Sequence, residues 1–139
     1  MNIYSIIPLL SENENEIIED IAAQHAGGVA DCFLFSMTLA PKGTPPLDLA
    51  GGLCARYRRF KAALDARRIP NGVLIQASIG HEYYQNSTRD FQHFVNLTDG
   101  QTTNTCCPLD EAFLSYIERA AAAIAGEHPS LVMLDDDFR

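Results

Sequence analysis

Four short runs of apolar residues divide the chain, and each has the length of a β-strand. They cover residues 3–10, 32–39, 73–79 and 131–134. Isoleucine, valine, leucine and phenylalanine dominate these runs, with little alternation of polar and apolar positions. Nearly continuous apolar character is typical of strands that are covered on both faces of a parallel sheet. The pattern therefore predicts four parallel strands.

Segments with helical spacing lie between these runs. Helices are predicted over residues 11–26, 47–69 and 108–126, where apolar residues recur every three or four positions and Gly or Pro residues follow the last turn. The resulting order of strands and helices is typical of right-handed parallel crossover units. The sequence thus predicts an α/β fold.

The α/β pattern matches half of a TIM-type (β/α)8 barrel, a fold that takes about 250 residues in full. No helix pattern follows the last predicted strand in the 139 residues of the sequence. We therefore expect a single α/β domain over residues 1–139 that is the N-terminal part of a longer barrel enzyme. A complete, small doubly wound α/β domain is the alternative.

The third and fourth predicted strands are separated by an unusually long connection, at residues 80–107. Loops beyond about 12 to 15 residues are usually functional or carry structure of their own. Residues 91–97 followed by Asp99-Gly100 indicate a β-hairpin with its turn at these two residues. A hairpin-bearing loop over the strand ends is the prediction.

Composition and charge reduce the number of function classes that the chain can belong to. Hydrophobic residues make up 47% and charged residues 20% of the chain, and the net charge is −8. Such acidity disfavours binding to nucleic acid. A signal segment and a membrane-length apolar run are both lacking, so we expect a cytoplasmic protein without a membrane partner. The cysteine spacing includes no CxxC pair, and neither a metal nor another cofactor is predicted.

Polar residues gather where the predicted strands end, which is where parallel sheets and barrels carry their sites. The second strand contributes Ser36 and Thr38, and the third contributes Gln76. The remaining candidates come after the third and fourth strands: His81, Glu82, Asp135, Asp136, Asp137 and Arg139.

Asp135 and Asp137 share one side of a strand of period two, whereas Asp136 points to the other. We predict that Asp135 and Asp137 are catalytic, by acid/base or nucleophilic work on a glycosidic bond. His81 and Glu82 would act on the same bond or contact sugar hydroxyls, with Asp136 and Arg139 as further substrate contacts. The alternatives are a hard-metal site and a solvated acidic strand end paired with Arg139.

A family resemblance adds to this interpretation. The Cys107-Pro108-Leu109-Asp110 segment with Phe113 and Tyr116, and the stretch 131–139 with its Asp-Asp-Asp-Phe-Arg ending, resemble barrel-type glycoside hydrolases. The resemblance implies a (β/α)8 catalytic barrel and a carbohydrate substrate. Catalytic carboxylates on later strands of that family would be missing from this chain, so the chain would lack a C-terminal half or self-associate.

Two other function classes compete with a glycosidase. One is a small α/β binding or signalling domain that uses the acidic strand end to hold Mg²⁺. The other is a structural unit whose exposed sheet edge pairs with a second copy.

Overall fold

The computed structural model describes residues 2–9, 12–76 and 90–135. In these ranges one sheet contains β1 (Tyr4–Pro8), β2 (Cys32–Thr38), β3 (Asn71–Gln76) and β6 (Val132–Leu134), in that order across the sheet. Each strand runs parallel to its neighbour. The α/β class and the prediction of neighbouring parallel strands in chain order are confirmed.

The helices of the described chain are α1 (Glu14–Ala26), α2 (Leu49–Ala66) and α3 (Glu111–Gly126). Aspartate carboxylates cap the last two, because Asp48 accepts a hydrogen bond from the Gly51 amide and Asp110 accepts one from the Ala112 amide. The capped ends fall where the sequence predicts them. The first helix begins at Glu14, the last residue of its predicted start.

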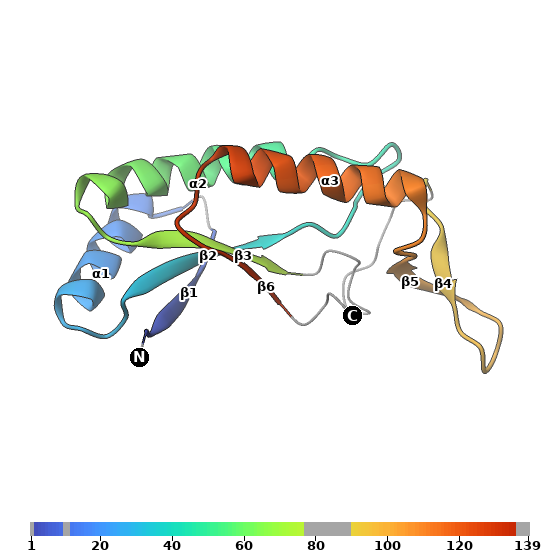
Figure 1. Cartoon of the computed structure of the whole chain (residues 1–139), viewed down its shortest axis with the longest axis horizontal. Helices are drawn as coiled ribbons and strands as arrows, with labels where there is room; N and C mark the ends of the chain where they lie inside the picture. Colours follow the sequence, from blue (N-terminus) through green and yellow to red (C-terminus); the bar gives the residue numbers. More distant parts are fainter. Residues whose placement is uncertain (1, 10–11, 77–89, 136–139) are drawn as a thin grey trace.

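The three labelled helices pack against the same face of the sheet. Figure 1 shows α2 and α3 running along one side of the strands. Side chains from α1, α2 and α3 join one buried cluster with the sheet residues Phe33, Phe35, Met37, Val73 and Ile75. Consecutive right-handed crossovers that advance in one direction place every helix on one face in this way.

The opposite face of the sheet is apolar, and no described helix contributes to it. Its centre is a small cluster of Cys32, Leu34 and Leu74, flanked by Leu131 and Met133. On β1, Tyr4 is 42% and Ile6 55% exposed. The prediction that the strands are covered on both faces is therefore wrong for β1 within the described residues, because all the described helices cross over the other face.

The predicted hairpin is present. β4 (His93–Val95) pairs antiparallel with β5 (Thr102–Cys106), and Gly100 in the connecting turn has a φ of +69°, which suits glycine. Phe91 and Cys106 pack against Phe113 and Tyr116 near the start of α3. Figure 1 shows the β4–β5 hairpin beside the start of α3, beyond the C-terminal end of the parallel strands. Residues 80–89 of the predicted loop lie outside the described ranges.

Candidate functional site

A row of polar residues crosses the C-terminal end of the sheet on the face opposite the helices. Thr38 and Gln76 are register partners of β2 and β3. Asp135 follows β6, and its backbone amide donates to the Ile75 carbonyl oxygen at 3.0 Å, which continues the parallel pairing. The strand register therefore brings together residues that are far apart in the sequence.

A hydrogen-bond chain links three strands within this row. The Gln76 side-chain amide donates from Nε2 to Oδ2 of Asp135 at 2.9 Å. The Ser36 hydroxyl donates to Oε1 of the same glutamine. Gln76 thus connects a serine to a carboxylate and fixes both, which is the kind of preorganisation that a catalytic or binding group needs.

A pocket of about 400 Å³ opens beside this chain and is called the strand-end pocket below. It is bounded by the end of β1, the end of β2 and the first turns of α2, and Leu9, Leu49 and Leu53 form its apolar wall. Its polar lining consists of the hydroxyl residues Ser36 and Thr38 and the charged residues Lys42, Asp48 and Arg56.

Of the six residues predicted to form the site, the structure describes Asp135. It lies at the strand end as expected, next to Gln76. The side chains of Ser36 and Gln76 also gather there, as the strand-end argument predicts. The other five predicted residues lie outside the described ranges: His81, Glu82, Asp136, Asp137 and Arg139.

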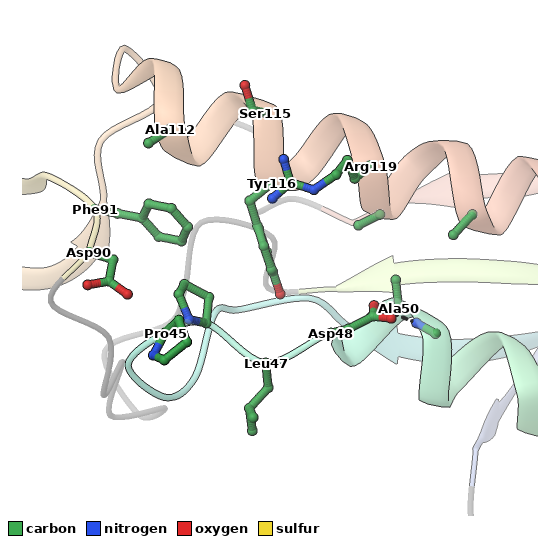
Figure 2. A pocket seen from close by; sticks show the side chains of 14 residues that line it. Pro45, Leu47, Asp48, Ala50, Asp90, Phe91, Ala112, Ser115, Tyr116 and Arg119 are labelled. Carbon is green, nitrogen blue, oxygen red and sulfur yellow. Dashed lines mark hydrogen bonds between the residues drawn. The ribbon is translucent and has the colours of Figure 1, made fainter.

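A second, larger cavity of about 750 Å³ lies between α3 and the segment that precedes α2, and is called the helix groove below. Figure 2 shows Tyr116 pointing from α3 toward that segment, where its hydroxyl donates to the Leu39 carbonyl oxygen at 3.0 Å. Phe91 stands at one end of the groove, 5.6 Å from the Tyr116 ring centre. Burial, with a smaller effect of the Asp48 charge, raises the pKa of Tyr116 to about 12, so its hydroxyl stays a donor at neutral pH.

The sequence gives only a weak signal for the helix groove. Its floor includes small residues of α2 and α3, among them Ala50, Gly51, Ala120 and Ala123, which read as ordinary helix residues. Small side chains leave room between two packed helices. The groove thus depends on how the helices approach each other, which no local pattern reveals.

The cysteines do not form a reactive or metal-binding centre in the described part of the chain. Burial raises the pKa of the thiols of Cys32 and Cys54, which disfavours the reactive thiolate. Cys106 is buried opposite His93 in the hairpin, as expected for a packing residue. The described residues contain no group of three His, Cys, Asp or Glu residues that could hold a metal ion.

Comparison with known proteins adds no relative: no family profile, curated protein or solved structure matches this chain. The resemblance to barrel-type glycoside hydrolases thus stays a prediction. None of the helices in the described ranges has the length and apolar character needed to cross a bilayer.

Proposed function

We propose that this chain forms part of a (β/α)8 barrel enzyme that hydrolyses glycosidic bonds in a carbohydrate, with Asp135 as a catalytic carboxylate. The observation that carries the proposal is the chain of hydrogen bonds from Ser36 through Gln76 to Asp135. It lies at the C-terminal end of three neighbouring parallel strands, where barrel enzymes place their chemistry.

The two faces of the sheet support the barrel. In a barrel the helices cover the outer face and apolar side chains fill the inner face in layers. Here the helices share one face, and the register places Ile6 beside Leu34 on the other. Leu74 and Met133 form a further pair on that face, and the polar row with Gln76 and Asp135 lies above them.

The chemistry needs two carboxyl groups flanking the scissile bond, one as acid and the other as nucleophile or base. Asp135, fixed by the amide of Gln76, suits the nucleophile or base, because both roles need a carboxylate held in one orientation. Asp137, the sequence-based candidate, remains the proposed second carboxyl group. His81, Glu82, Asp136 and Arg139 remain the proposed contacts to the sugar.

The test is an Asp135→Asn substitution, assayed on a panel of 4-nitrophenyl glycosides after a hydrolysed substrate has been found with the unmodified protein. Turnover should fall by more than about a hundredfold with the far-UV circular dichroism unchanged. Asp99→Asn in the hairpin turn is the matched control and should keep full turnover. Unchanged turnover in the folded Asp135→Asn variant contradicts the catalytic role.

A small-molecule binding domain without catalysis is the second candidate, and the helix groove favours it. The groove is larger than the strand-end pocket and has aromatic rings at one end. The chain contains five tyrosines and no tryptophan, so the difference in tyrosine fluorescence between the wild type and Tyr116→Phe reports on Tyr116. A ligand that changes this fluorescence in the wild type but not in Tyr116→Phe, with every glycoside left intact, would favour the binding domain.

A further inference from the structure

We propose that the strand-end pocket binds a negatively charged substituent of the sugar, either a carboxylate or a phosphate group. The inference rests on the proposed function, because it assigns a substrate class to the same site. An anionic group would accept charge-assisted hydrogen bonds from the cationic side chains of this pocket, which are stronger than those that a neutral sugar hydroxyl accepts.

The charges of the pocket differ in sign from those of the whole chain. Lys42 and Arg56 contribute two positive charges to the lining and Asp48 one negative charge, in a protein whose net charge is −8. The Asp48 carboxylate is already engaged at the start of α2, where its Oδ1 accepts from the Gly51 amide at 2.9 Å. The described lining of the pocket therefore carries one more positive than negative charge, in a protein that is acidic as a whole.

Arg56 differs from its neighbours on α2. Arg58 pairs with Glu127 and Arg59 with Glu14, whereas Arg56 forms no salt bridge within the described ranges and acts on Glu14 only through its charge, which helps to lower the pKa of that carboxyl. A guanidinium group presents parallel N–H donors that match the two oxygens of a carboxylate or phosphate. Arg56 is thus placed to bind an anion, with Lys42 as a second cation on the same lining.

The pocket is joined to the proposed catalytic carboxylate. Ser36 lines it and also donates to Gln76, which in turn donates to Asp135. An anionic sugar brought toward Asp135 would meet repulsion from a like charge. Two cations beside the hydroxyl groups of Ser36 and Thr38 would offset that repulsion and fix the sugar by its charged end.

Calorimetric titration of the full chain tests the inference with three probes: glucuronate, glucose 6-phosphate and glucose. Wild-type protein should bind one or both of the acidic sugars at least about tenfold more tightly than glucose, because hydrogen bonds to charged groups exceed neutral ones by that order. The relative affinities of glucuronate and glucose 6-phosphate identify the anion. The double variant Lys42→Gln/Arg56→Gln should lose the preference, and so in part should Arg56→Gln alone.

Arg68→Gln is the matched control, because it removes an exposed cation just beyond the other end of α2. It should keep the preference for acidic sugars, with circular dichroism confirming that every variant is folded. Equal affinity of the wild type for glucose and both acidic sugars, or a preference that survives in the folded double variant, overturns the inference. Hydrolysis of neutral glycosides that depends on Asp135 would then leave the proposed function standing. Charge-dependent binding without any hydrolysis would instead retain the pocket and reject the enzyme.

Discussion

The two faces of the parallel sheet differ in burial and in their contribution to stability. On the helix face, Phe33, Phe35 and Val73 are fully buried beneath α1, α2 and α3. On the opposite face, Leu34 and Leu74 are buried at the centre, but Ile6 on β1 stays 55% exposed. Burial of apolar area is the main source of stability, so most of it comes from the helix face.

The faces also differ at their C-terminal ends. The helix face continues as buried Met37 and Leu39, whereas the opposite face ends in Thr38, Gln76 and Asp135. These polar groups lie at a strand end, away from the main core, and Gln76 hydrogen-bonds to Asp135. They can therefore bind a ligand without weakening the core packing that stabilises the fold. The comparison shows that the fold rests mainly on the helix face, whereas the polar row of Thr38, Gln76 and Asp135 lies on the other face.

The largest effect should come from Phe35→Ala. Phe35 is fully buried, with the Phe60 ring centre 4.9 Å away and that of Tyr57 5.7 Å away. Its loss leaves a cavity and should lower the free energy of unfolding by about 3 to 5 kcal/mol in urea titrations. The control Ile6→Ala on the other face should cost less than about 1.5 kcal/mol, because that side chain is half exposed. An equal loss of unfolding free energy in the two variants would show that Ile6 is as deeply buried in solution as Phe35, which would contradict the comparison of the two faces.

Gly72→Ala should have the next largest effect, on the face without helices. A Cβ at this position would lie 2.3 Å from the Leu131 carbonyl oxygen and 3.0 Å from Leu34 Cδ2. The Leu131 oxygen also accepts from the Val73 amide at 2.9 Å, so relief of the clash strains the β3–β6 pairing. We expect a loss of about 1 to 3 kcal/mol in the same titrations. Wild-type stability in this variant would mean that β6 shifts freely.

Tyr57→Phe probes a buried polar contact on the helix side. The Tyr57 hydroxyl donates to Asn71 Oδ1 at 2.8 Å, and removal of the donor leaves a buried acceptor at a cost of about 1 to 2 kcal/mol. Burial raises the pKa of Tyr57 above its ordinary value of 10.0. The wild type should therefore lose stability as the pH rises past 10, because the unfolded chain ionises first. Thermal unfolding between pH 7 and 11 should show a smaller loss in Tyr57→Phe.

The smallest effect concerns the ion pair between Arg58, which is exposed, and Glu127, away from both faces of the sheet. The hydrogen bond from Arg58 lowers the pKa of Glu127 below its ordinary value of 4.5, so the contribution is present above that pH and lost as the pH falls. Arg58→Gln should reduce stability slightly at pH 7, and the difference should vanish below the lowered pKa of Glu127 and shrink in high salt. A difference that persists in acid would point to a packing role of the arginine.

The sequence by itself determined the elements. The apolar run at 32–39 contains β2, and β3 covers the described part of the run that begins at residue 73. Asp48 and Asp110 are helix caps, and the turn with Gly100 joins a hairpin. These features depend on residues close together in the chain, which is why local patterns predict them. Strand order in the described sheet followed from the alternation of strands and helices.

The tertiary structure alone decided which side chains meet. Gln76 and Asp135 are 59 positions apart and Ser36 and Gln76 are 40 apart, and only the register of β2, β3 and β6 joins them. The placement of all described helices on one face and the helix groove beside Tyr116 also depend on the tertiary structure. Register and helix approach are set by packing across the whole sheet, whereas a sequence pattern fixes only which side of its own strand or helix a residue occupies.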